Sequence, residues 1–210
     1  MGSEQLNRIY RASRLKSWWA ALSLLLMAGC AYEISTIQGV ARPEKIRALE
    51  RVAVAPFRYP SDWTGLFRDV YAKAGLEAPD VKKIEMIEGS FLIRDALAAK
   101  GYLVLRWPEE LEKKKAENPL NAEGGVSGDH LAALKGSGAQ AVLIAGGGRS
   151  CEDVEVCVAR VEVRLIDLGT QEALWESQAA ATTALSQGDE MKAAVSIAFD
   201  AFPEKSPDSN

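Results

Sequence analysis

The sequence contains few of the residues on which most catalytic and metal sites depend. Among 210 residues there is one histidine, His130, and there are three cysteines, Cys30, Cys151 and Cys157. A single histidine excludes any site built from two of them, and the cysteines lack the paired spacing of zinc sites. We therefore predict no metal, no cofactor and no catalytic residue. We interpret His130 as a solvated residue at the start of a short helix.

The sequence also lacks an excess of positive charge and a hydrophobic run long enough to cross a membrane. Its formal net charge is −4 at pH 7. A mildly acidic chain has no electrostatic reason to bind nucleic acid or anionic headgroups, so we predict no nucleic-acid partner. A membrane-spanning helix needs about 20 apolar residues, and the run from Trp18 to Met27 is roughly half as long.

The first 30 residues have the three parts of an export signal. Four basic residues come first: Arg8, Arg11, Arg14 and Lys16. The apolar run then ends in Leu24 to Cys30, with the sequence LLLMAGC. This motif resembles the signal peptide of bacterial lipoproteins, in which the cysteine is lipidated and becomes the first residue of the mature chain. The resemblance implies a signal peptide at 1–29 and attachment of palmitate-type acyl chains at Cys30.

The residue after Cys30 bears on the membrane to which the protein is sorted. In the lipoproteins of diderm bacteria, Asp at this place favours retention in the inner membrane, and here the residue is Ala31. The resemblance therefore implies the periplasmic face of the outer membrane, with the inner membrane as the alternative. Removal of 1–29 would change the net charge to −7, because that segment contains four basic residues and one acidic residue. Acyl chains would then be the only attachment to the bilayer.

Assigning Cys30 to lipid leaves Cys151 and Cys157 as a pair. An exported chain enters an oxidising compartment, where an even number of cysteines is typical of disulfides. We predict a Cys151–Cys157 disulfide, and the alternative is two free thiols. Between them lie Glu152, Asp153 and Glu155, which we interpret as a solvated acidic loop rather than a cation site.

Hydrophobic patterning divides the mature chain into three parts. Residues 30–49 show no periodicity and contain Pro43, so we predict a lipidated N-terminus followed by an irregular tether. Residues 50–202 contain alternating strand and helix patterns and form the predicted periplasmic domain. Residues 203–210 are polar, and we predict a disordered tail.

Within 50–202 the patterns predict an α/β fold with a mixed sheet. Short apolar runs at 51–57, 102–105 and 141–145 are typical of buried strands, and Gly146 to Gly148 would form a flexible strand end. Helical patterns separate these runs, which favours parallel pairing through crossovers. A long strand over about 154–167 and another around Leu174 and Trp175 predict an antiparallel hairpin, followed by a last helix. The expected product is about five strands covered by helices.

Two further helices have apolar faces whose partners the sequence leaves open. The first, at about 62–75, presents Trp63, Leu66, Phe67 and Val70. We favour core packing for this face, and the alternative is a surface for a partner or a membrane. The second begins near Asp80 and ends at Gly101. Its predicted buried face runs through Ile84, Ile87, Phe91 and Ala98.

Three stretches, at 51–57, 138–144 and 165–175, resemble a periplasmic α/β domain shared by several bacterial lipoproteins. That domain occurs in the curli-export lipoprotein, in the N-terminal domain of the Tol-system propeller protein and in lipoprotein activators of peptidoglycan synthases. The resemblance implies a non-catalytic scaffold or adaptor that binds another envelope protein. Two alternatives remain: a subunit of an oligomeric secretion channel, and an envelope enzyme with an unidentified carboxylate site.

Overall fold

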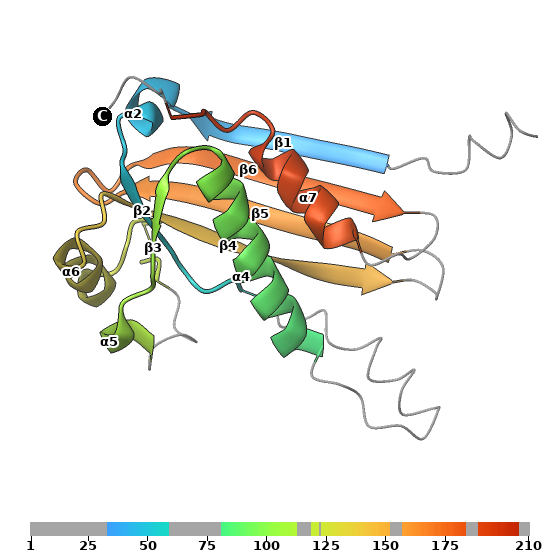
Figure 1. Ribbon diagram of the computed structural model, residues 1–210, viewed down its shortest axis with the longest axis horizontal. Coiled ribbons are helices and arrows are strands. Elements are labelled where there is room, and N and C mark those ends of the chain that lie inside the picture. Colours follow the sequence, from blue (N-terminus) through green and yellow to red (C-terminus); the bar gives the residue numbers. More distant parts are fainter. Residues whose placement is uncertain are drawn as a thin grey trace, which may run out of the picture. The chain divides into compact units, whose positions relative to one another are not determined.

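A mixed sheet of six strands is the centre of the part of the chain that the structure describes (Figure 1). The structure is a computed structural model, and it describes residues 33–58, 81–112, 119–121, 123–151, 157–183 and 189–205. The strands are β1 (Glu33–Ala41), β2 (Arg51–Val54), β3 (Leu103–Leu105), β4 (Ala141–Cys151), β5 (Cys157–Asp167) and β6 (Ala173–Thr183). The helices are α2 (Pro43–Arg47), α4 (Val81–Ala99), α5 (Glu109–Glu112), α6 (Gly128–Gly136) and α7 (Glu190–Phe199).

The strand order in the sheet is β1-β6-β5-β4-β2-β3. β2 lies parallel to β3 and to β4, and each of these connections passes through helical segments. The pairs β4–β5, β5–β6 and β6–β1 are antiparallel. The predicted fold class is confirmed: a mixed α/β sheet with helices, and a C-terminal antiparallel hairpin followed by a helix.

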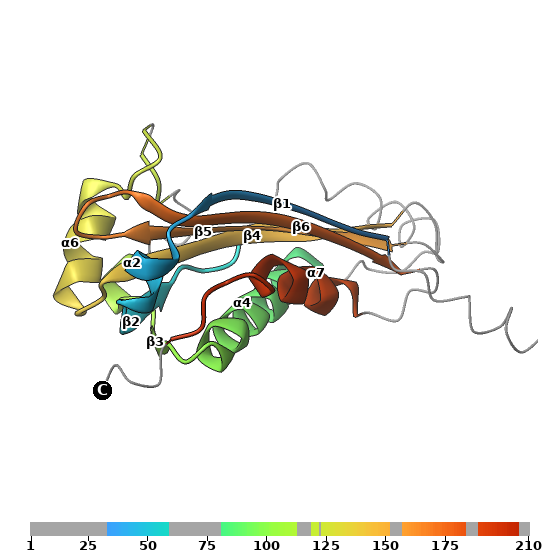
Figure 2. The ribbon, with the colours of Figure 1, turned by 90° about the horizontal axis from the view of Figure 1, so that it is seen from above.

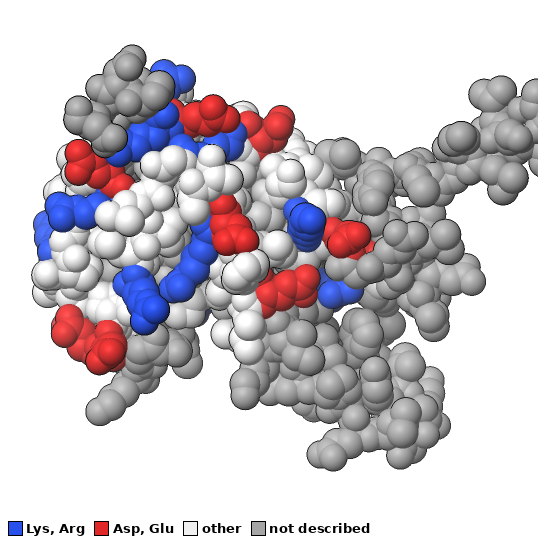
Figure 3. Space-filling model, in the orientation of Figure 1, with Lys and Arg blue, Asp and Glu red and all other residues white. Residues whose placement is uncertain are grey.

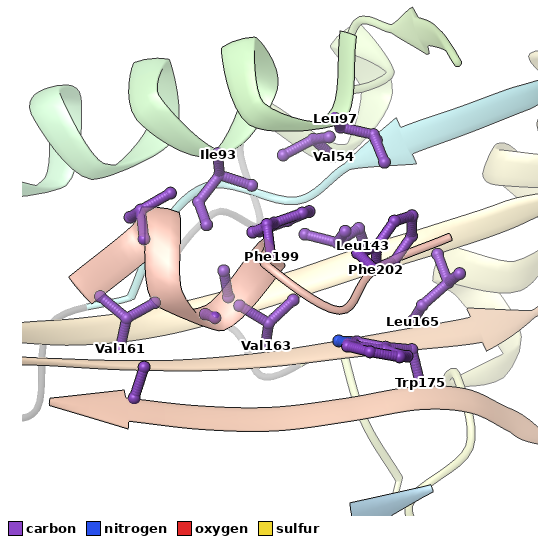
Figure 4. Close-up of a cluster of buried hydrophobic side chains, with 14 of the residues drawn as sticks. Val54, Ile93, Leu97, Leu143, Val161, Val163, Leu165, Trp175, Phe199 and Phe202 are labelled. Atoms are coloured by element: carbon purple, nitrogen blue, oxygen red, sulfur yellow. The ribbon is translucent and has the colours of Figure 1, made fainter. Parts of the chain in front are cut away.

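Helices α4 and α7 lie on one face of the sheet (Figure 2). The larger core lies beneath them, where Ile93 and Leu97 of α4 are fully buried together with Phe199 of α7 (Figure 4). Trp175 on β6 joins this core, and its ring centroid lies 5.3 Å from that of Phe202 in an edge-to-face arrangement. Burying each such side chain stabilises the fold by about 1.5–3 kcal/mol.

The opposite face of the sheet is covered by described helices at one end only (Figure 2). There a smaller core packs Leu134 of α6 and Trp107 against Val142, Ile144 and Ile166 of the sheet. Farther along β5 the side chains of Arg160 and Glu162 on this face are exposed. The two faces therefore differ: among the described residues, helices cover the hairpin on the face with α4 and α7.

The prediction of an irregular segment before residue 50 is wrong for residues 33–47. Residues Glu33 to Gln38 pair in register with Thr182 to Ser177, so β1 extends the sheet beyond the hairpin. Local sequence gives no signal for this strand, because its backbone partners come from β6, more than 130 residues away. Pro43 does not break a helix but starts α2, at a position where the missing N–H is not needed.

The predicted buried face of α4 is also wrong. Ile87 and Phe91 are each 63% exposed, and Ala98 is exposed as well. The buried face of α4 contains Ile93 and Leu97, and one turn before Ile93 it contains a glycine, Gly89, in place of a large side chain. A Cβ atom at Gly89 would lie 2.7 Å from the ring of Phe57, so the glycine allows the helix to approach this ring. The Phe57 N–H donates to Ser90 Oγ at 3.0 Å.

Gly146, Gly147 and Gly148 do not form a flexible strand end. They lie inside β4, which pairs with β5 without a break from Ala141 to Cys151. The chain after β2 returns to this region at Arg58, whose carbonyl accepts a hydrogen bond from the Gly147 N–H at 2.8 Å. A Cβ atom at Gly146 would lie 3.0 Å from the same carbonyl oxygen. The glycines therefore allow close approach of a neighbouring backbone.

The start of the predicted tail belongs to the described fold. The Tyr102 hydroxyl donates to the Pro203 carbonyl at 3.1 Å, and the Lys205 N–H donates to the Lys100 carbonyl at 2.9 Å. Residues 203–205 therefore lie along the connection between α4 and β3. Residues 206–210 lie outside the described residues.

Candidate functional site

Several residues singled out from the sequence lie outside the described residues. These are Cys30 with the signal segment, the acidic residues Glu152, Asp153 and Glu155, and the set Trp63, Leu66, Phe67 and Val70. Their predicted roles stay predictions.

The two cysteines of the predicted disulfide lie opposite each other at the end of the β4–β5 hairpin. Cys151 is the cross-strand partner of Cys157 in the antiparallel register. Opposed residues of an antiparallel pair have Cα atoms about 4.5–5.5 Å apart, which is within the range of about 4.4–6.8 Å found in disulfides. This register supports the predicted disulfide, which stays a prediction.

His130 is not solvated as predicted. It lies in α6 and is 2% exposed. Its Nδ1 is 2.7 Å from Ser127 Oγ, and its ring centroid is 6.0 Å from that of Trp107. Trp107 is itself 7% exposed and belongs to the smaller core. His130 is therefore part of the smaller core.

A groove of about 340 Å³ lies between α7 and the two strands β6 and β1. Both the sheet and the helix contribute to its lining: Thr36, Gln38, Trp175, Ser177, Ser196, Ile197, Ala198, Asp200 and Ala201. Most of the polar groups are neutral hydroxyls and amides, and Asp200 is the one ionisable residue in this lining. The sequence analysis did not identify the groove, because it exists only where β1 extends the sheet beyond the cover of α7.

Trp175 gives the groove an unusual floor. Its side chain is 1% exposed, and its buried Nε1 has no hydrogen-bond partner among the described residues. In Figure 4 the indole nitrogen lies at the end of the ring that is nearer Val163. Ser177, two residues farther along β6, is also buried and lines the groove. Buried polar groups are nearly always paired, so an unpaired indole donor here is a notable feature.

β1 forms one edge of the sheet and borders the groove. Within the described part of the chain, β6 is its only neighbour in the sheet. Residues Thr36 to Gly39 are exposed, and Ile37 on the opposite face is 66% exposed. The strand has no charged residue between Ile34 and Ala41 and no proline. Natural edge strands usually carry charge, proline or a bulge that prevents pairing with another chain. In β1 the register shift lies between Gln38 and Ala41, so the stretch from Ile34 to Gln38 is the part of this edge that is open to pairing.

A charged cluster with one fully buried member lies at the far end of the same helix-covered face. Arg149 of β4 places Nη1 3.5 Å from Glu190 Oε2 of α7 and Nη2 3.9 Å from Glu88 Oε2 of α4. Glu190 is fully buried. One guanidinium therefore joins the sheet to both covering helices. Its partners belong to structural elements of the core, so we interpret this cluster as structural.

The described residues show neither a metal cluster nor a membrane-spanning helix. No group of three or more His, Cys, Asp or Glu side chains that could hold a metal ion occurs among them. None of the helices described is long and apolar enough to cross a bilayer. Positive and negative side chains alternate over the described surface that carries α4 and α7 (Figure 3).

Comparison with known proteins gives similarity at the level of the fold. No family model matches the sequence, and no curated protein matches it. Among solved structures, the PelC dodecamer from Paraburkholderia phytofirmans has 17% sequence identity and a TM-score of 0.47, over 84% of this chain and 100% of that chain. The hypothetical protein CT253 from Chlamydia trachomatis has 13% identity and a TM-score of 0.45, over 72% and 92%.

A third solved structure is described as a lipoprotein. Lipoprotein GNA1162 from Neisseria meningitidis has 17% identity and a TM-score of 0.38, over 72% of this chain and 96% of that chain. These likenesses concern the α/β fold. The finer resemblance to the curli-export group stays a prediction from the sequence.

Proposed function

We propose that this chain is a lipid-anchored protein on the periplasmic face of the bacterial outer membrane. In this proposal its α/β domain binds another protein of the cell envelope and catalyses no reaction. The LLLMAGC motif ending at Cys30 supports the anchor. The open edge of β1 and the groove beside it support a binding role, because they present unpaired backbone and a lined cavity on one side of the domain.

The observation that carries the proposal is where the sheet begins. β1 starts at Glu33, three residues after Cys30. At no more than about 3.3–3.6 Å per residue, the chain between them can span only about 10 Å. Lipidation at Cys30 would therefore hold the N-terminal end of β1 close to the bilayer surface. A partner of this edge would be a membrane protein or a protein that works at the membrane surface.

The anchor can be tested with Cys30→Ser in the full-length chain expressed in a diderm bacterium. We expect the wild-type chain to incorporate labelled palmitate and to fractionate with the outer membrane. The variant should lose the label and accumulate as an unprocessed or soluble product. Palmitate labelling of the variant, or its retention in the outer membrane, would contradict the proposal.

Binding can be tested by crosslinking in intact cells that express the tagged wild-type chain, with Cys30→Ser as the control. We expect a defined heterologous envelope protein to crosslink to the wild-type chain and to be lost with the anchor. A detergent-stable ring of many copies without a heterologous protein would instead support the secretion-channel alternative.

A further inference from the structure

We propose that the edge of β1 and the adjoining groove bind an extended segment of the partner, which adds a strand to the sheet. This inference rests on the proposed function and names the surface through which the partner is recognised. It also assigns a chemistry to the partner: an extended peptide segment with a neutral or basic side chain that enters the groove.

The backbone of β1 supplies the first part of the argument. In an antiparallel pair, the N–H and C=O groups of alternate residues point away from the neighbouring strand. β1 pairs with β6 in regular register from Glu33 to Gln38, and a register shift follows before Ala41. Among the described residues no other strand pairs with β1, so the outward groups form a row over Glu33 to Gln38. An added strand satisfies such a row with main-chain hydrogen bonds, and this mode of recognition is common for peptides.

The groove supplies the second part, which concerns specificity. Successive side chains of a strand point to opposite faces of the sheet. On the α7 face, alternate residues of an added strand would lie beside Thr36 and Gln38, which line the groove. A long side chain there can reach over β1 towards Ser196 and Ala201. Neutral hydroxyl and amide groups suit a polar side chain, and the carboxylate of Asp200 disfavours an acidic one.

The other edge of the sheet fits this role less well. β3 has three residues. Just before it, the Lys100 carbonyl already accepts a hydrogen bond from the Lys205 N–H. Pairing of β1 with β1 of a second copy is the competing arrangement at the first edge. In that pairing each groove would receive side chains no longer than Gln38. A heterologous peptide can supply the longer side chain that the groove volume accommodates.

The experiment uses the purified, lipidated mature chain in detergent and a phage-displayed library of random peptides as the probe. We expect enriched peptides to have neutral or basic residues at alternate positions and to slow hydrogen exchange of the outward-facing β1 amides within Glu33 to Gln38. Ser196→Trp and Ala201→Trp fill the groove from exposed positions, and each should weaken binding by about tenfold or more. Lys192→Trp is the matched control, since Lys192 is exposed on the same helix but does not line the groove.

Four results would overturn the inference. The library could yield no enriched peptide, or its peptides could bind Ser196→Trp and Ala201→Trp as tightly as the wild-type chain. Protection of the β1 amides could instead increase with protein concentration in the absence of peptide, which would assign the edge to a second copy. An envelope protein that still crosslinks to Ser196→Trp would remove this inference and leave the proposed function standing. Groove-dependent peptide binding without any crosslinked envelope protein would support the peptide-binding surface and contradict the proposed function.

Discussion

Gly89 of α4 lies against the ring of Phe57, and a Cβ atom added to Gly89 would be 2.7 Å from Cγ and Cδ1 of that ring. This pair determines how closely the longest described helix approaches the sheet. Gly89→Ala should therefore lower the free energy of unfolding by about 1–3 kcal/mol, as overpacking of a tight core does. Denaturant unfolding of the purified chain measures the change.

The matched control for this prediction is Gly136→Ala in α6. A Cβ atom at Gly136 meets no atom within 4 Å, so we expect this substitution to act only through the higher helix propensity of alanine. It should leave stability unchanged or raise it by up to about 1 kcal/mol. Equal losses for both variants would show that the Gly89–Phe57 approach is not what limits packing.

Arg149 holds two covering helices through Glu190 and Glu88, and its removal should be costly. Arg149→Met leaves the fully buried Glu190 beside an apolar side chain, and breaking a buried ion pair in this way costs about 3–5 kcal/mol. The double variant Arg149→Met with Glu190→Leu should recover a large part of the loss, because no buried charge is left behind at that pair. The exposed pair of Lys45 and Glu172 is the control, and Lys45→Ala should change stability little. A double variant no more stable than the single one would contradict the assignment.

Tyr102 gives the fold a dependence on alkaline pH. Burial raises the pKa of its hydroxyl to about 12, and the nearby positive charge of Arg47 reduces this rise in part. The neutral phenol is favoured in the folded state, where it donates to the Pro203 carbonyl. Its contribution to stability is fully present below pH 10, the ordinary pKa, and is lost as the pH rises from 10 to 12. Unfolding curves across this range should show a smaller decline in Tyr102→Phe than in the wild-type chain.

The register of the β4–β5 hairpin predicts that Cys151 and Cys157 form a disulfide in the exported protein. Mass spectrometry of the mature chain, alkylated without reduction, should find both cysteines unmodified, and reduction should make both available. Closing so short a loop would stabilise the fold by about 2–2.5 kcal/mol in the chain-entropy model. Two alkylated thiols in protein taken from the periplasm would contradict this prediction.

The sequence determined those parts of the fold whose signals are local. The apolar runs of β2, β3 and the start of β4 identify strands. β2 and the start of β4 are buried, whereas β3 lies at an edge of the sheet and its Leu103 is 58% exposed. The alternation from Ala159 to Leu165 identifies the hairpin strand, and the stripe on α7 identifies its buried side. The order of these elements predicts a mixed sheet, because helices between early strands require parallel crossovers. The predicted export signal is likewise a local pattern, ending at Cys30, and it stays a prediction.

Tertiary structure alone decided the features that form the candidate site. β1 has neither apolar alternation nor a turn signal, and it is a strand because β6 supplies its hydrogen bonds across more than 130 residues. The buried side of α4 includes Gly89, whose lack of a side chain leaves room for the ring of Phe57. A glycine adds nothing to an apolar pattern, so the sequence did not indicate this side. The groove exists because β1 extends the sheet past the strands that α7 covers. How far a helix covers a sheet depends on tertiary packing, and no local sequence pattern predicts it. Long-range pairing and close approach depend on distant partners, whereas hydrophobic periodicity reports only which residues of one segment share a face.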